Sequence, residues 1–131
     1  MLGGQVVART ERAVRVLETS HPPVYYVPAN DFVSDALRPA PGASWCEFKG
    51  EAAYLDVVTE GVVAEAAGWT YPAPSRGFEQ LRGMIAVYPG KMDRVTVAGE
   101  LVRPQAGGFY GGWITDRVVG PFKGELGTTG W

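Results

Sequence analysis

Residues 51–71 read EAAYLDVVTEGVVAEAAGWTY, and this stretch decides the fold class. Two runs of mainly apolar residues flank the turn pair Glu60-Gly61. Runs of this kind on either side of a short turn that contains glycine are typical of a β-hairpin. The sequence therefore predicts a strand from Glu51 to Val58 and a returning strand from Val62 to Tyr71, which Pro72 ends.

The flanking segments continue the β pattern. Gly83 to Tyr88 has apolar residues at both odd and even positions, which predicts a central strand that is covered on both faces. Val95–Val97 and Leu101–Val102 predict a closing hairpin that turns at Ala98-Gly99. Near the start of the chain, Val6–Ala8 and Val14–Val16 predict a first hairpin.

Proline and glycine mark the connections, because the chain has 10 prolines and 18 glycines. Val24–Val27 lies between prolines, so we expect it to be extended or at a sheet edge. Asn30–Leu37 and Ser75–Leu81 predict short helical turns, and Pro39–Gly42 predicts a loop. The predicted fold is all-β, with compact antiparallel sheets, one or two helical turns and an irregular tail.

Length and composition predict one domain and exclude several classes of function. The chain has 131 residues and a net charge of −2, with no basic run that would indicate nucleic-acid binding. No secretory start or membrane-spanning stretch is present, and the single cysteine fits a reducing compartment, so we expect a cytoplasmic protein. One histidine and one cysteine do not make a structural zinc site, and we expect no metal and no cofactor.

The composition changes at residue 104, which suggests a domain over residues 1–103 and a tail over residues 104–131. The tail holds eight glycines and five aromatic residues: Phe109, Tyr110, Trp113, Phe122 and Trp131. Aromatic side chains bury large surfaces, so we expect the tail to pack on the domain. Packing on a neighbouring subunit, in a homodimer, is the alternative.

The first candidate site is LETSHPPVYY, residues 17–26. Strand parity places Glu18 on the same side as Val14 and Val16, where a carboxylate is costly unless it is paired. His21 is the only histidine, and its ordinary pKa suits proton transfer. The structural alternative is that His21 caps a turn and that backbone donors satisfy Glu18.

The second candidate site is WCEFKGEAAYL, residues 45–55. In an extended chain Lys49 and Glu51 share a face, where Lys49 would bind an anionic group and Glu51 would act as acid or base. A bulge at Gly50 would change this parity, and a simple ion pair at a sheet edge is the alternative. Cys46 is treated as a small side chain that lines the site rather than as a nucleophile.

Aromatic residues complete the predicted site. Trp69 and Tyr71 are two residues apart and share a face, which is typical of a core or of a pocket wall. Tyr26 is grouped with them as a ligand-binding residue. The chain contains neither a phosphate-binding G-x-x-x-x-G-K-[ST] loop nor a G-x-S-x-G nucleophile elbow.

Three stretches together resemble a known bacterial family, the domain of unknown function 427. They are RVLETSHPPVYY at residues 15–26, CEFKGEA at 46–52 and WTYP at 69–72. The similarity covers about Gln5 to Val97, and residues 107–124 are similar to an extension seen on shorter members.

The resemblance implies a tent-like arrangement of antiparallel sheets. Zinc-binding exchange factors and B-type methionine sulfoxide reductases share this architecture, but this chain lacks their paired CxxC motifs. The family also carries a nucleotidyltransferase-like label, and the acidic metal pair of that chemistry is absent from this sequence. Fold similarity alone does not supply a function.

Three functions are consistent with these residues. The first is an acid–base enzyme or a binder of a small polar or anionic ligand, with Glu18, His21, Lys49 and Glu51 as active groups. The second is a non-catalytic interaction module that uses the aromatic tail. The third is nucleotide binding through Lys49 and Lys123 next to glycine amides.

Overall fold

The computed structural model describes residues 1–17, 21–46, 49–105 and 111–116. Within these ranges the chain forms antiparallel strands and single-turn 3₁₀ helices, which confirms the all-β prediction. The strands are β1 (Val14–Val16), β2 (Val24–Pro28), β3 (Leu37–Cys46), β4 (Gly50–Thr59), β5 (Val62–Thr70), β6 (Met84–Val87), β7 (Thr96–Val97), β8 (Glu100–Leu101), β9 (Arg103–Pro104) and β10 (Trp113–Ile114). The 3₁₀ helices are η1 (Ala29–Asp31), η2 (Glu79–Leu81) and η3 (Pro89–Lys91).

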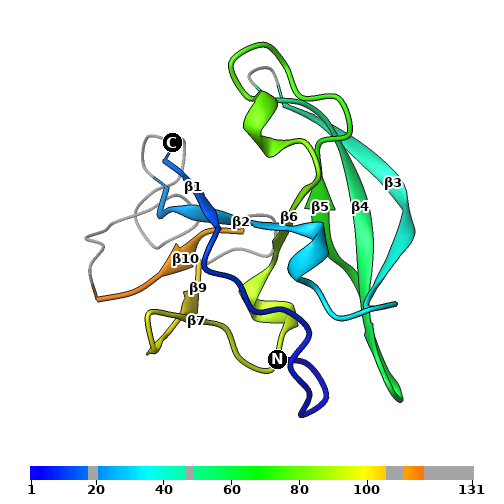
Figure 1. The fold of residues 1–131 in the computed structure, drawn as a ribbon, viewed down its shortest axis with the longest axis vertical. Coiled ribbons are helices and arrows are strands. Elements are labelled where there is room, and N and C mark those ends of the chain that lie inside the picture. Colours follow the sequence, from blue (N-terminus) through cyan, green and yellow to red (C-terminus); the bar gives the residue numbers. More distant parts are fainter. Residues whose placement is uncertain (18–20, 47–48, 106–110, 117–131) are drawn as a thin grey trace.

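The main sheet has six strands in the order β1-β2-β6-β5-β4-β3 (Figure 1). Its long hairpin, β4 and β5, is the one that residues 51–71 predict, and Thr59 pairs with Val62 at the turn. Gly61 in this turn has φ +81°, a conformation that glycine adopts at little cost. The predicted hairpin is therefore confirmed.

Strand β6 joins the two halves of the sheet. Its residues are buried, and it pairs with β2 through Val27 and Ile85 and with β5 through Trp69 and Ala86. The prediction of a central strand covered on both faces is confirmed. Figure 1 shows β2 running across the direction of β4 and β5, so the sheet bends at β6.

Two small sheets lie beside the main one. Strands β7 and β8 form the predicted closing hairpin, and its turn residues Ala98 and Gly99 both have positive φ. This pair of conformations is typical of the tight turn that matches the twist of two strands. Strands β9 and β10 pair with each other, with Trp113 opposite Pro104.

The predicted first hairpin is wrong. Strand β1 pairs with β2, whereas Val6–Ala8 runs beside the segment after η1, where Ala8 forms a bridge with Phe32. The reason is the polar segment that follows Ala8: the Thr10 hydroxyl and the Arg12 guanidinium both donate to the Asp31 carboxylate, at 2.6 and 2.7 Å. These bonds hold residues 10–12 against η1, so the chain does not turn back there to form the predicted hairpin. Strand β2 is extended as predicted, but it lies inside the sheet.

The predicted loop at Pro39–Gly42 is also wrong, because these residues belong to β3. Its pairing with β4 shifts register between Pro39 and Ala43. Strand β3 is at the edge of the sheet, where a proline without an N–H donor is tolerated. The helical turns predicted at 30–37 and 75–81 are reduced to η1 and η2.

Two hydrophobic clusters cover the two faces of the sheet, since neighbouring residues of a strand point to opposite faces. What we call the aromatic cluster has the following buried members: Tyr26, Ala52, Trp69, Tyr71, Leu81, Met84 and Ala86. The aliphatic cluster on the other face has these: Leu2, Val7, Ala36, Val57, Ala67, Val87, Val102 and Trp113.

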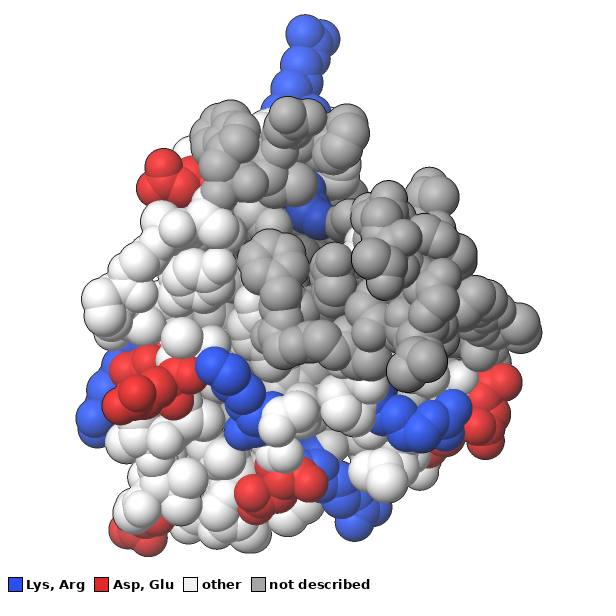
Figure 2. Space-filling view, turned by 180° about the vertical axis from the view of Figure 1, so that it is seen from behind, with Lys and Arg blue, Asp and Glu red and all other residues white. Residues whose placement is uncertain are grey.

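Charged side chains are dispersed over the surface that Figure 2 displays, where Lys and Arg alternate with Asp and Glu around its rim. Among the described residues, no helix has both the length and the apolar character needed to cross a membrane.

Candidate functional site

The rings of the aromatic cluster form a continuous row. Tyr26 lies between Tyr71 and Trp69, with ring centroids 6.3 and 6.2 Å from theirs, and Tyr88 packs on the far side of Trp69 at 4.7 Å. The Trp69 indole N–H donates to the Tyr26 hydroxyl at 3.3 Å. Burial raises the pKa of Tyr88, and the nearby hydroxyls of Tyr54 and Tyr26 add to this effect.

Lys49 lies at one end of this row. Its side chain is only 7% exposed, and its Nζ atom is 5.9 Å from the centre of the Tyr71 ring. Gly50, at φ +109°, redirects the chain directly after Lys49, and a Cβ there would meet the Ala73 carbonyl oxygen at 3.2 Å. The Ser75 N–H donates to the Lys49 carbonyl at 2.9 Å, so the backbone on both sides of this turn is held in place.

A second lysine lies at the other end of the row. The Nζ atom of Lys91 is 5.7 Å from the centre of the Tyr88 ring, and it donates to the carbonyl oxygens of Glu65 and Ala66. Lys91 is exposed, unlike Lys49. The two pairs therefore share a cation–π geometry but differ in burial.

His21 joins the cluster through the short β9–β10 sheet. Its Nδ1 atom is 3.2 Å from the nitrogen of the Gln105 side-chain amide, within hydrogen-bond distance. The Trp113 N–H donates to the Pro23 carbonyl at 2.8 Å. Gly111 lies directly against the Trp69 ring, where any Cβ would overlap the indole. The His21 region and the aromatic row are thus in contact through this sheet.

Four of the predicted site residues meet in this region: Lys49, Tyr26, Trp69 and Tyr71. Glu51 does not join them, because it is exposed whereas Lys49 is buried. This difference in burial favours the alternative in which Gly50, which has a positive φ, changes the parity of Lys49 and Glu51. Glu18 lies outside the described residues. Cys46 is the last residue of β3, opposite Gly50, and its side chain lies outside the described part.

No group of three His, Cys, Asp or Glu side chains suited to hold a metal ion occurs within residues 1–17, 21–46, 49–105 and 111–116.

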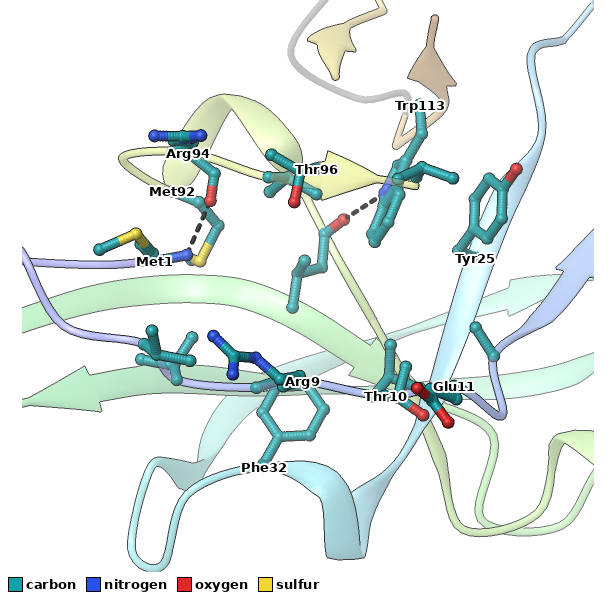
Figure 3. A pocket seen from close by; sticks show the side chains of 18 of the residues that line it. Met1, Arg9, Thr10, Glu11, Tyr25, Phe32, Met92, Arg94, Thr96 and Trp113 are labelled. Atoms are coloured by element: carbon teal, nitrogen blue, oxygen red, sulfur yellow. Dashed lines mark hydrogen bonds between the residues drawn. The ribbon is translucent and has the colours of Figure 1, made fainter. Parts of the chain in front are cut away.

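A pocket of about 500 Å³ opens on the opposite face of the sheet (Figure 3). Its walls come from the N-terminal segment, from β2 and β6, and from residues 92–98, with Trp113 at one end. None of the predicted catalytic or ligand-binding residues lines this pocket, although Tyr25 of the first candidate stretch and Trp113 of the tail do. Its lining is spread over segments that are far apart in the chain, and no local pattern brings them together.

Comparison with known proteins gives a family but no function. No curated protein matches the chain. A family model described as "Domain of unknown function (DUF427)" matches residues 1–98, which include every strand of the main sheet, Lys49 and the aromatic row. This match confirms the resemblance seen in the sequence, and the chain belongs to the DUF427 family.

Proposed function

We propose that the protein binds a small polar or anionic metabolite next to the aromatic row, between Lys49 and His21, and that it transforms this ligand by acid–base chemistry. Lys49 binds the anionic group, Tyr26, Trp69 and Tyr71 form the wall, and Glu18 and His21 transfer protons. Glu51 has no part in this proposal, because it is exposed whereas Lys49 is buried.

The observation that carries the proposal is the burial of the Lys49 side chain over the Tyr71 ring. Lysine is rarely buried to this extent, because removing an ammonium group from water costs free energy. A lysine that is buried over an aromatic ring holds its charge in a fixed place, which is suited to the recognition of an anion. The Nζ atom of Lys91 is at a similar distance from a tyrosine ring, 5.7 Å, but Lys91 is exposed to water, so it supplies the control.

His21 supports the acid–base part of the proposal. The contact between Nδ1 of His21 and the Gln105 side-chain amide, at 3.2 Å, holds the imidazole in position. Histidine is suited to proton transfer near neutral pH, and a hydrogen bond that orients its ring is typical of general acid–base residues.

A thermal-shift screen tests the proposal, with inorganic phosphate, sugar phosphates, nucleotides and small carboxylic acids as probes. A ligand at about 100 times its Kd adds roughly 2.7 kcal/mol to the free energy of unfolding, a shift of several degrees in Tm for a domain of this size. We expect the shift in the wild type and in Lys91→Met, and its loss in Lys49→Met. Without any shift across the panel, or with equal shifts in both lysine variants, the proposal fails.

The His21→Gln variant separates binding from chemistry. It should keep the thermal shift of the ligand found in the screen, because the anionic group is bound by Lys49, but it should lose turnover of that ligand. Loss of the shift in His21→Gln together with unchanged turnover would contradict the assigned roles.

The alternative of a protein-interaction module finds no support in Trp113. This ring of the tail is 6% exposed, stacks on Tyr25 at 5.0 Å and donates from its indole N–H to the Val87 carbonyl. It is therefore not accessible to a partner. Phe109, Tyr110, Phe122 and Trp131, the other rings of the tail, lie outside the described residues, as does Lys123.

A further inference from the structure

We infer that the pocket in Figure 3 is a second ligand site, for a small molecule that joins an aromatic body to one negatively charged group, such as an aromatic carboxylate. This site lies on the face of the sheet opposite the Lys49 site, and the inference does not depend on the proposed function.

The size and walls of the pocket point to an apolar ligand body. A volume of about 500 Å³ lies within the range of small-molecule sites, whereas voids in a packed core rarely exceed the size of a water molecule. Val7, Val27, Phe32 and Val87 form apolar walls. Apolar walls of this extent favour a ligand with an apolar surface, because binding removes that surface from water.

One end of the pocket is aromatic and rigid. Tyr25 and Trp113 stack there with an interplanar angle of 25°. The indole N–H of Trp113 is fixed by its bond to the Val87 carbonyl, at 3.2 Å. A flat ring of the ligand can extend this stack, and such aromatic pairs contribute beyond the area that they bury.

The other end of the pocket is cationic. In Figure 3 the side chains of Arg9 and Arg94 lie toward the end opposite Tyr25 and Trp113. The Arg9 guanidinium makes no hydrogen bond or ion pair with any residue in the described part of the chain. Glu11 is the only carboxylate in the lining, against two guanidinium groups. A guanidinium group binds a carboxylate through two parallel hydrogen bonds, which favours an anionic group at this end.

The two segments that carry these arginines are held together. The Gly4 N–H donates to the Asp93 carboxylate, and the Asp93 N–H donates to the Met1 carbonyl, both at 2.9 Å. The Arg9 N–H also donates to the Asp31 carbonyl at 3.2 Å. The cationic end is therefore formed before a ligand arrives, which reduces the entropy lost on binding.

Calorimetric titration of the full chain with naphthoate, and with neutral naphthamide of nearly the same shape, tests the inference. We expect the wild type to bind both probes, and naphthoate more tightly. Arg9→Gln should weaken naphthoate binding by about ten- to a hundredfold, as expected for the loss of a charge-assisted hydrogen bond, and leave naphthamide binding unchanged. Arg82→Gln, an exposed arginine outside the pocket, is the matched control and should change neither affinity.

A second variant fills the pocket. Val97 is half-buried in the pocket wall on the short strand β7, and Val97→Phe should abolish binding of both probes. Three results would overturn the inference: no saturable binding at millimolar concentration in the wild type, unchanged binding in Val97→Phe, or equal weakening of both probes by Arg9→Gln. Lys49→Met should leave naphthoate binding intact, so this site and the proposed one fail independently.

Discussion

Two neighbouring residues of β2, Tyr25 and Tyr26, face opposite sides of the same sheet and meet different surroundings. Tyr26 is 1% exposed and packed between other rings, whereas Tyr25 lines a pocket of about 500 Å³. The rings around Tyr26 are closely packed, whereas the aliphatic face is left open beside Tyr25. The difference indicates that Tyr26 mainly stabilises the sheet, while Tyr25 forms part of the wall of a pocket.

The origin of the difference lies in what covers each face. On the aromatic face, large rings from β2 and β5 contact one another directly. On the aliphatic face, the cover consists of the N-terminal segment and residues 92–98, which contain little regular structure and are joined by backbone hydrogen bonds. A pocket of about 500 Å³ remains between these segments and the sheet.

The largest expected effect separates the two tyrosines. Tyr26→Ala should lower the free energy of unfolding by about 3–5 kcal/mol, as for other large rings removed from a core, because it leaves a cavity and deprives the Trp69 N–H of its acceptor. Tyr25→Ala should cost less than half of this, since Tyr25 is only half-buried. Urea denaturation of both variants measures the difference. Equal losses would mean that the two faces contribute alike.

The next effect tests how closely the β9–β10 sheet approaches the aromatic row. A methyl group at Gly111 overlaps the Trp69 ring, so Gly111→Ala should cost about 1–3 kcal/mol through overpacking. Gly90→Ala is the control, because its Cβ would make ordinary contact with Pro104 at 3.6 Å. Thermal unfolding compares the two variants. A neutral Gly111→Ala would show that the indole moves aside easily.

A smaller effect appears at high pH on the aromatic face. The pKa of Tyr88 is raised in the folded protein above its ordinary value of 10.0, because burial disfavours the phenolate. The folded state therefore holds this proton more tightly, and the stabilisation is complete below pH 10 and is lost as the pH rises through the folded pKa. Tyr88→Phe should reduce the loss of stability above pH 10 and remove one late step from the absorbance titration of tyrosine. Removal of a step near pH 10 instead of a later one would place Tyr88 in water.

The smallest effect concerns Asp31 of η1, which accepts hydrogen bonds from Thr10 and Arg12 of the N-terminal segment. Asp31 has a lowered pKa, first because Arg12 donates to it and then because Thr10 does. The stabilisation is present above the ordinary value of 3.8 and is lost as the pH falls through the folded pKa. Asp31→Asn should lower Tm slightly at neutral pH and match the wild type in acid. A constant Tm difference between about pH 2 and pH 7 would assign the effect to something other than this charge.

The parts of the fold that depend on local pattern could be predicted from the sequence. The hairpin from Gly50 to Thr70 follows from its two β-rich runs and Gly61, and β6 follows from its unbroken apolar character. The first hairpin could not be predicted, because alternation identifies a strand and not its partner. The bonds from Thr10 and Arg12 to Asp31 decide that pairing, and they join residues about twenty positions apart.

The candidate site was accessible to sequence reasoning only in part. Tyr26, Trp69 and Tyr71 were grouped as one apolar wall, and the structure brings their rings together. The sequence identified Gly50 as a residue that could change the parity of Lys49 and Glu51, but strand alternation alone could not decide between the two arrangements, and the positive φ of Gly50 is seen only in the structure. The pocket near Arg9 could not be found, because its walls are remote from one another in the chain and meet only in three dimensions.

The four residues of β6 also determine the order in which the chain can fold. Strand β2 emerges early during synthesis, but Ile85 and Met84, its partners on β6, follow about sixty residues later. Until then β2 has only the three residues of β1 as a neighbour, and Tyr25 and Tyr26 remain in water. Pairings between such distant segments carry a large loop-closure entropy, so folding should be slow for a domain of this size. The main sheet can be completed only after β6 has been synthesised. A nascent chain that ends before Met84 contains β3, β4 and β5 but lacks the strand that joins β2 to them, and its exposed aromatic strand is a site where chaperones would bind.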